Sequence, residues 1–388
     1  MASDAILVLN SGSSSIKFAV FGNDDGRRLI GGQIAGIGDA PSFSATDGEG
    51  LALALDVVGV TDHAGALSVL LDWLQGDDLA LKITAAGHRV VHGGTAYTRP
   101  VRISPGVIAD LKDLKPLAPH HQPHNLAAIE ALADRLPDLD QVACFDTAFH
   151  AGQPPEASQL GLPAAYGARG MRRYGFHGLS YEHVLSALPA LSGGALPSRL
   201  VIAHLGNGAS MCAVRDGVGI ATTMGFSTLD GLPMGSRSGS LDPGAILHLM
   251  RQDGLDLKAL EDLLYNRSGL LGVSGISSDM RVLLESDAPG AAQAVDFYCY
   301  RIARELGSLA AALGGIDALV FTGGIGENAA AVRADVINRS AWLGFSLDPT
   351  ANDGKAARIT GTDGTASAWI VPADEERVIV RHVMDIIR

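Results

Sequence analysis

The chain has 388 residues, which at roughly 100–200 residues per domain predicts two domains. Its formal net charge is −13, from 29 Lys and Arg against 42 Asp and Glu, which argues against a duplex-binding protein. Hydrophobic residues make up 47% and charged residues 18%, so the chain can build a sizeable core, and global disorder is excluded. Glycine is in excess, with 48 residues where average usage, about 7%, predicts far fewer.

The termini and cysteines carry information about the compartment. Three widely spaced cysteines and the absence of a CxxC pair argue against a disulfide framework and favour a reducing compartment. Residues 1–4 lack the basic start of a secretory signal. Because no apolar stretch approaches the ~18 residues that a membrane span needs, we expect a cytoplasmic protein without membrane contact.

The first predicted elements are a short buried strand at residues 6–9, a polar turn at 10–15 and a returning strand at 16–21. A similar unit occurs at residues 200–214, where the turn reads LGNGAS. A shift of 196 residues pairs Leu9 with Leu205, Gly12 with Gly208 and Ser14 with Ser210. The shift is close to half of 388, which favours two structurally similar halves. The alternative is a coincidence of two common turns.

The remaining elements alternate in type along the chain. Apolar residues recur at helical spacing in residues 65–74, 107–114, 125–136, 242–251, 255–264 and 291–313. The last of these is apolar nearly all round and predicts a helix buried between layers. Short buried strands are predicted at 141–145, 318–321 and 368–371, and loops at 38–50 and 153–166. Strands that alternate with helices predict an α/β fold.

Three glycine-rich polar turns follow predicted strands, at residues 10–15, 206–210 and 323–328. Each can direct backbone N–H groups at phosphate oxygens. One such turn alone is more often an ordinary tight turn, but three at strand ends favour a nucleotide. The sequence contains no GxxxxGK[ST], no complete GxGxxG after a strand and neither HRD nor DFG, which excludes a P-loop, a Rossmann fingerprint and a protein kinase.

Four charged residues are candidates for the chemistry. Arg89 and Arg237 lie among small residues and are candidate anion clamps, with structural salt bridges as the alternative. Asp146 follows the strand at 141–145, where ligands gather in α/β sheets. Glu375 follows a strand too, and it either holds Mg²⁺ or, as the residues alone favour, complements a helix dipole. The loop histidines lack the spacing of an HExxH metal site.

Together these motifs resemble the acetate kinases. The matching segments, in order, are ILVLNSGSSSIKF (6–18), GHRVVHGG (87–94), FDTAFH (145–150), YGFHG (174–178), HLGNGAS (204–210), MGSRSGSLDP (234–243) and FTGGIGEN (321–328). The resemblance extends from residue 6 to about residue 380. It implies an α/β fold of two similar ribonuclease-H-like domains, of the actin and sugar-kinase type, with a nucleotide cleft between them. The implied domains are residues 1–150 plus about 373–388, and residues 151–372, which carry the adenosine site.

The resemblance also implies the reaction. It is a reversible transfer of the ATP γ-phosphoryl to acetate, giving acetyl phosphate and ADP by direct in-line transfer. The implied cofactor is Mg²⁺, for which Mn²⁺ can substitute, and the enzyme is a cytoplasmic homodimer that binds neither nucleic acid nor membrane. Because a carboxylate at neutral pH is already a deprotonated nucleophile, Asp146 is expected to orient Mg²⁺ or its waters rather than to abstract a proton.

Residue roles carry over from the family position by position. The implied catalytic residues are Asp146, His177, Arg237 and Arg89. The implied carboxylate site consists of Arg89, Val91, His121, Phe176 and Arg237. The implied ATP contacts are Ser13, Ser15, Lys17, His204, Leu205, Gly206, Asn207, Gly208, Asp279, Met280, Arg281, Gly324, Ile325, Gly326, Glu327 and Asn328. Asn10 and Glu375 are the implied metal residues.

The chain departs from the common family pattern at several positions, which are His120, Gln122, His124, Leu179, Tyr181 and Thr228. Thr228 stands where some members have a proline in the acetate pocket. A more polar pocket does not favour longer acyl chains, so acetate stands ahead of propionate or butyrate as the predicted acceptor. Two further classes are a non-catalytic actin-like ATPase, against which the arginine clamp argues, and a histidine metal-dependent hydrolase, which would bind stoichiometric zinc.

Overall fold

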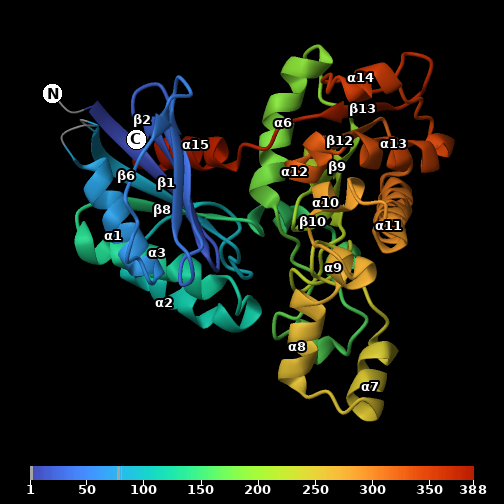
Figure 1. Ribbon diagram of the computed structural model, residues 1–388, viewed down its shortest axis with the longest axis horizontal. Helices are drawn as coiled ribbons and strands as arrows, with labels where there is room; N and C mark the ends of the chain where they lie inside the picture. The colour runs from blue at the N-terminus through green and yellow to red at the C-terminus, as the bar shows by residue number, and fades with distance from the viewer. Residues whose placement is uncertain (1–2, 77–78, 80) are drawn as a thin grey trace. The chain divides into compact units, whose positions relative to one another are not determined.

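The computed structural model describes residues 3–76, 79 and 81–388 and divides the chain into two compact units (Figure 1). The first unit comprises Met1–Phe149 together with Asp374–Arg388, and the second comprises His150–Ala373. The C-terminal segment thus belongs to the same unit as the N-terminal half of the chain.

Within the described residues, the first unit is built on an eight-stranded sheet with the order β5-β4-β3-β2-β1-β6-β8-β7. Its strands are β1 (Ser3–Ser11), β2 (Ser15–Gly22), β3 (Arg28–Ala35), β4 (Ser42–Asp47), β5 (Ala52–Leu53), β6 (Leu81–Val90), β7 (Val101–Arg102) and β8 (Asp140–Phe145). Its helices are α1 (His63–Leu74), α2 (Pro105–Asp113), α3 (Gln122–Arg135) and α15 (Glu375–Ile387), with a 3₁₀ turn η1 (Lys115–Leu117).

The second unit is built on a sheet with the order β11-β10-β9-β12-β13. Its strands are β9 (Arg199–Leu205), β10 (Ala209–Arg215), β11 (Val218–Thr222), β12 (Ala318–Thr322) and β13 (Ser367–Ile370). The 3₁₀ turn η2 (Ala148–Gly152) spans the boundary between the units in the sequence. The helical segments that follow it are α4 (Pro155–Ser158), α5 (Ala164–Gly167), α6 (Gly178–Ser192), α7 (Pro243–Gln252), α8 (Leu257–Asn266), α9 (Gly269–Ser274), α10 (Met280–Leu284), α11 (Pro289–Leu313), α12 (Gly323–Asn328), α13 (Ala330–Arg339), η3 (Ala341–Leu343) and α14 (Pro349–Asp353).

The two sheets repeat one topology. In the first unit β3, β2 and β1 pair antiparallel, and β6 and then β8 continue the sheet parallel to β1. In the second unit β11, β10 and β9 pair antiparallel, and β12 and then β13 continue parallel to β9. The echo at 196 residues in the sequence therefore reflects equivalent first hairpins, β1–β2 and β9–β10. The α/β class expected from the sequence is confirmed.

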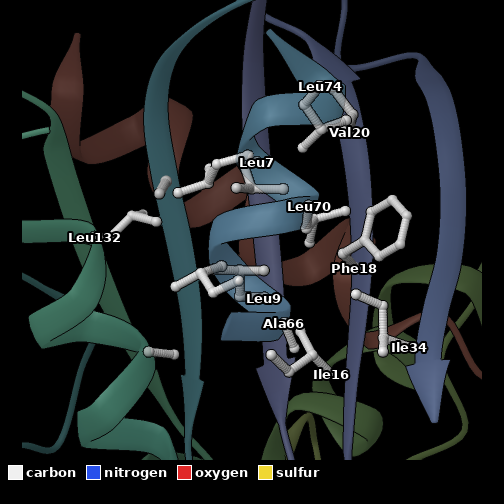
Figure 2. Packing of buried hydrophobic residues seen from close by; sticks show 14 of the residues in the cluster. Leu7, Leu9, Ile16, Phe18, Val20, Ile34, Ala66, Leu70, Leu74 and Leu132 are labelled. Atoms are coloured by element: carbon white, nitrogen blue, oxygen red, sulfur yellow. The ribbon is translucent and has the colours of Figure 1, made fainter. Parts of the chain in front are cut away.

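The core of the first unit lies between its sheet and α1 and α3 (Figure 2). Leu7 and Leu9 of β1 point into this core together with Leu70 of α1. Alternation along a strand sends Ile6 and Val8 to the opposite face, which α15 covers. Helix α1 begins at His63, two residues before the predicted start, because the side chain of the N-cap residue Asp62 accepts the N–H of Gly65 at 2.8 Å.

Four predicted elements were wrong. Residues 38–50 contain strand β4, whose Phe43 and Ala45 face the core while serine and threonine alternate outward, so polar composition hid the pattern. Residues 153–166 contain the short helix α4 and most of the short helix α5. Helix α11 is buried along one face only, and Tyr300 on it is 49% exposed. Residues 323–328 form α12 rather than a turn. None of the helices in the described ranges is both long and apolar enough to cross a membrane.

Candidate active site

Arg89 is the centre of a polar cluster in the first unit. Its Nε and Nη2 atoms donate to both carboxylate oxygens of Asp146, with contacts of 3.0 Å to Oδ1 and 2.5 Å to Oδ2. Its Nη1 donates to Asn10 Oδ1 at 3.2 Å, and Glu375 Oε2 lies 3.7 Å from Nε. The guanidinium therefore holds three oxygen-bearing side chains from separate parts of the sequence.

Parallel strand ends explain why these residues meet. Asn10 is near the end of β1, Arg89 is near the end of β6, and Asp146 directly follows β8. These three strands are adjacent and parallel, so their carboxyl ends share one edge of the sheet, where ligands bind in α/β folds. Glu375 reaches the same edge as the first residue of α15, after Asp374 has capped the helix.

Burial makes the ion pair depend on both partners. The Arg89 side chain is 20% exposed and the Asp146 side chain only 1%. Burial alone lowers the pKa of Arg89, but the charges of Asp146 and Glu375 outweigh it and raise that pKa above its ordinary value. Arg89 thus stays cationic, and removing either partner leaves a poorly solvated charge, which costs about 3–5 kcal/mol in buried pairs.

The oxygen atoms of this cluster fit a hard divalent cation. Asn10 supplies an amide oxygen and Glu375 a carboxylate, and Mg²⁺ is usually held by one or two carboxylates together with waters and substrate phosphates. In the described part of the chain no three His, Cys, Asp or Glu side chains are grouped as a metal cage. The donor set therefore suits a cation that arrives with a nucleotide better than one in a closed protein site.

Contacts from outside hold the turn between β1 and β2. Asn125 Nδ2 donates to the Ser11 carbonyl at 2.8 Å, and His63 Nε2 donates to the Gly12 carbonyl at 2.7 Å. Because the N–H of a trans peptide points opposite to its carbonyl, the Ser13 N–H faces away from His63. The predicted phosphate residues Ser13 and Lys17 are exposed and Ser15 is half-buried. The supporting side chains of Asn125 and His63 were missed, since neither carries a sequence signal.

A pocket of about 750 Å³ in the second unit brings together most of the predicted adenosine residues. It is lined by the predicted Gly206, Asn207, Asp279, Met280, Arg281, Gly324, Ile325 and Asn328, and by the unpredicted Ser278, Leu284 and Ala329. Five predicted nucleotide contacts of the second unit are not among its lining residues, namely His204, Leu205, Gly208, Gly326 and Glu327. The Glu327 carboxylate instead accepts the N–H of Ala373 at 2.9 Å.

Two features shape that pocket. Gly323 begins α12 with a φ of 78°, and a Cβ there would lie 2.9 Å from the Leu205 carbonyl oxygen, so only glycine allows this approach. Buried Arg333 donates to the carbonyls of Gly326 and Glu327, both at 3.0 Å, and so satisfies the end of α12. Arg333 was missed because its sequence context resembles any polar helix position.

His177 lies in a second polar network of this unit. Its φ of 58° places a non-glycine residue in the left-handed region at the start of α6, a strain common at functional sites. Its Nδ1 lies 2.8 Å from Ser210 Oγ, and its ring stacks on His204 with centroids 4.3 Å apart. Arg237 of the same unit is half-buried, and its Nη1 donates to the Thr228 carbonyl at 3.2 Å.

The remaining predicted carboxylate residues divide between the units. Val91 follows β6 and is 4% exposed, and His121 occupies the N-cap position of α3 without a capping hydrogen bond from its side chain. Phe176 precedes His177 in the second unit and is 1% exposed. Of the predicted site residues of the first unit, Asn10, Arg89, Asp146 and Glu375 thus gather at one sheet edge. In the second unit, the predicted residues that share the pocket gather near the ends of β9 and β12.

Comparison with known proteins identifies the family of this chain. The profile of the Acetokinase family matches residues 5–381. The acetate kinase of Rhodopseudomonas palustris strain TIE-1 is 51% identical over 98% of both chains. The crystal structure of Porphyromonas gingivalis acetate kinase matches with a TM-score of 0.90 at 36% identity, covering all of both chains. That of a propionate kinase from Francisella tularensis matches with a TM-score of 0.92 at 33% identity, covering 99% of this chain and 100% of that one. The chain therefore belongs to the acetokinase family.

Proposed function

We propose that this chain is an acetate kinase that transfers the γ-phosphoryl of ATP reversibly to acetate. The observation that carries this proposal is the Arg89 cluster, a cation held by Asp146 and Glu375 at the ligand-binding edge of the sheet. It occurs in a chain 51% identical to a named acetate kinase, and that similarity implies ATP as the phosphoryl donor and a divalent metal as cofactor. The enzyme is thus a phosphotransferase with a carboxyl group as acceptor.

The reaction needs charge neutralisation more than acid–base chemistry. One acetate oxygen attacks the γ-phosphorus in line, the bond from phosphorus to the β,γ-bridging oxygen breaks, and ADP leaves with that electron pair. No proton has to be removed from acetate. Arg89 and Arg237 bind the acetate carboxylate and the migrating phosphoryl, and His177 donates a hydrogen bond to that phosphoryl.

The metal role follows from the oxygen donors of the first unit. Asn10 and Glu375 would hold Mg²⁺, with Mn²⁺ as a substitute, and the cation would neutralise phosphate charge. Asp146 would orient Arg89 and the waters of that cation rather than act as a base. The turn from Ser11 to Ser15 binds phosphate oxygens through its N–H groups and hydroxyls.

The pocket of the second unit takes the nucleoside. Its volume of about 750 Å³ is large enough for an adenosine, and Gly206 and Asn207, from the turn between β9 and β10, help to line it. Val91 and Phe176 supply the apolar wall for the methyl group of acetate in this proposal, and His121 contributes to acetate binding. Each unit is an actin-like ATPase domain in this proposal, and the protein functions in the cytoplasm.

An apolar surface supports a homodimer. Helix α7 has no buried residue along its described length, and Leu247 and Met250 on it are 48% and 42% exposed. Leu241 just before it and Leu257 on α8 are 43% and 67% exposed. Monomeric proteins rarely keep such a patch open to water. Light scattering should give twice the chain mass, and Leu247→Glu with Met250→Glu should give a monomer; a wild-type monomer would contradict the dimer.

The direct test measures acyl phosphate formation. Purified protein with ATP, Mg²⁺ and acetate should yield a product that hydroxylamine traps as a hydroxamate. Arg89→Ala and Arg237→Ala should each lower kcat at least 100-fold while the fold persists. The matched controls are Arg102→Ala and Arg267→Ala, exposed arginines that pair with Asp140 and Asp262. Absence of product with every short acid would sink the proposal.

A propionate kinase is the second candidate, because a solved propionate kinase matches this chain over 99% of its length. One methylene in an apolar pocket is worth only about 1–3 kcal/mol in discrimination. The kcat/KM values for acetate, propionate and butyrate decide between the candidates. We expect acetate to exceed propionate by roughly 10-fold or more.

A further inference from the structure

Two buried hydroxyl groups connect to the imidazole of His177 in one chain. The Ser210 Oγ lies 2.8 Å from His177 Nδ1 and also hydrogen-bonds the hydroxyl of Tyr181. Tyr181 and Ser210 are both 0% exposed. Bulk water therefore has no access to either hydroxyl, and only protein groups determine the hydrogen bonds that link Tyr181, Ser210 and His177.

We propose that Tyr181 and Ser210 are positioning residues that fix the tautomer of His177, with its proton on Nε2. This inference rests on the role of His177 in the proposed function. Ser210 has one hydroxyl proton, so it donates to one neighbour and accepts from the other. The phenol of Tyr181 is the stronger donor of the two hydroxyls, so it donates to Ser210, and Ser210 donates to Nδ1. A neutral imidazole that accepts at Nδ1 carries its proton on Nε2.

The position of His177 Nε2 explains why the choice of tautomer matters for phosphoryl binding. A Cβ placed on Gly208 would lie 3.4 Å from His177 Nε2, so this edge of the ring faces the glycine turn between β9 and β10. The opposite tautomer would present a lone pair there, which repels an anionic phosphoryl oxygen. The Nε2–H tautomer presents a donor instead, and no proton has to be rearranged when the phosphoryl arrives.

The helix geometry brings Tyr181 to this position. Tyr181 lies one turn beyond His177 on α6, and its backbone N–H donates to the His177 carbonyl at 3.2 Å. The ring of Tyr181 meets that of His150 edge to face, with centroids 5.6 Å apart. The tyrosine side chain at this position is long enough for its hydroxyl to reach Ser210.

Two further histidines lie close to this group. His204 of β9 stacks on the His177 ring, and His150 meets the Tyr181 ring edge to face and donates from Nε2 to the Phe176 carbonyl at 3.0 Å. Burial lowers the pKa of His150 to about 4, so this ring is neutral at pH 7. His150 therefore places no positive charge beside the hydroxyl groups of Tyr181 and Ser210 that hold His177.

The kinetic test removes one hydroxyl at a time. Tyr181→Phe keeps the aromatic contact and should lower kcat about 3- to 10-fold with KM changed less than about 2-fold, as expected for one lost hydrogen bond. Ser210→Ala should lower kcat at least as much, and Tyr181→Phe should add nothing in that background. The matched control is Tyr174→Phe, a buried phenol that donates to the Gly170 carbonyl at 2.7 Å, for which we expect unchanged kcat.

A spectroscopic test separates positioning from a structural role. In protein labelled with ¹⁵N-histidine, the His177 signals, assigned by their loss in His177→Gln, should report an Nε2–H tautomer in the wild type. Tyr181→Phe should shift them toward a tautomer mixture, and Tyr174→Phe should not. An Nδ1–H wild type, an unchanged tautomer in Tyr181→Phe, or multiplying losses of kcat in the double variant would overturn the inference.

Failure of the proposed function gives a different pattern. If His177→Gln keeps wild-type kcat, the catalytic role of His177 fails whatever the tautomer is. If His177→Gln loses activity while Tyr181→Phe and Ser210→Ala keep both kcat and tautomer, only the hydroxyl chain fails.

Discussion

The approach of α15 to β6 provides a sharp test of how the Arg89 cluster is held. A Cβ on Gly87 would lie 2.4 Å from Ile379 Cγ2 and 2.7 Å from Val383 Cγ2, where carbon atoms prefer about 3.5–4.0 Å. Gly87→Ala must therefore push α15 outward by about 1 Å or distort its side chains. Such overpacking costs about 1–3 kcal/mol of the free energy of unfolding.

The same displacement reaches the chemistry because α15 begins at Glu375, whose carboxylate lies 3.7 Å from Arg89. A misplacement of about 1 Å at a reacting centre can lower turnover about 100-fold. We expect Gly87→Ala to lower kcat/KM by 10- to 100-fold and to raise the Mg²⁺ concentration needed for half-maximal rate. Hydroxamate assays across a Mg²⁺ series, with urea unfolding of the same samples, measure both effects.

A second substitution makes the reasoning refutable. Ile379→Ala removes the nearer methyl group and should cost about 2–5 kcal/mol alone, because Ile379 is 1% exposed. Combined with Gly87→Ala, the two costs should fall well short of their sum, since the new methyl fills the space. Gly161→Ala, with no atom within 4 Å of its Cβ, is the control. Wild-type activity and stability in Gly87→Ala, or strictly additive costs, would refute the steric account.

Three further perturbations test other parts of the molecule. Burial lowers the pKa of His88 to about 4, below the ~6.5 of an unfolded chain, so unfolding takes up a proton below pH 6.5. The free energy of unfolding should fall between about pH 6.5 and 4, and His88→Gln should flatten this slope by about one proton in urea titrations. Arg333→Met leaves two carbonyls of α12 without a donor and should cost about 2–4 kcal/mol and weaken ATP binding, as thermal unfolding with and without ATP would report. His63→Leu removes the hydrogen-bond donor to the Gly12 carbonyl and should raise the KM for ATP about 5- to 10-fold, whereas His63→Gln should raise it less. An unchanged KM in His63→Leu would show that His63 does not support the turn between β1 and β2 for ATP binding.

The sequence predicted the elements whose pattern is local. Buried runs such as residues 141–145 and 318–321 became β8 and β12, and the echo between Leu9 and Leu205 marked two equivalent hairpins. It also predicted that Asp146 stands at a strand end. These predictions succeed because an apolar run and the glycine turn after it lie next to each other in the sequence, and together they determine where a strand forms and where it ends.

What the sequence did not predict depends on contacts between distant segments. From the residues alone, Glu375 reads as a charge at a helix start, and only the docking of α15 onto β6 brings it to Arg89. Asn125 bridges the Ser11 carbonyl and the Val91 N–H, and an asparagine inside a helix gives no sign of this. Long-range contacts of polar groups follow from the fold, so they become visible only when the fold is known.

The charges around Arg89 explain why a chain with a net charge of −13 can act on two anions. One guanidinium faces the carboxylates of Asp146 and Glu375, so the cluster by itself carries one negative charge and repels phosphate and acetate. A bound divalent cation reverses that sign to one positive charge. Arg89 therefore serves first to hold the oxygen donors and only then to attract substrate, and nucleotide affinity should depend on Mg²⁺.

Calorimetric titration of ATP should give binding at least 10-fold weaker in EDTA, with a smaller difference in Glu375→Gln, because removing one carboxylate neutralises the cluster. Equal affinity for ATP with and without the cation would contradict this charge argument.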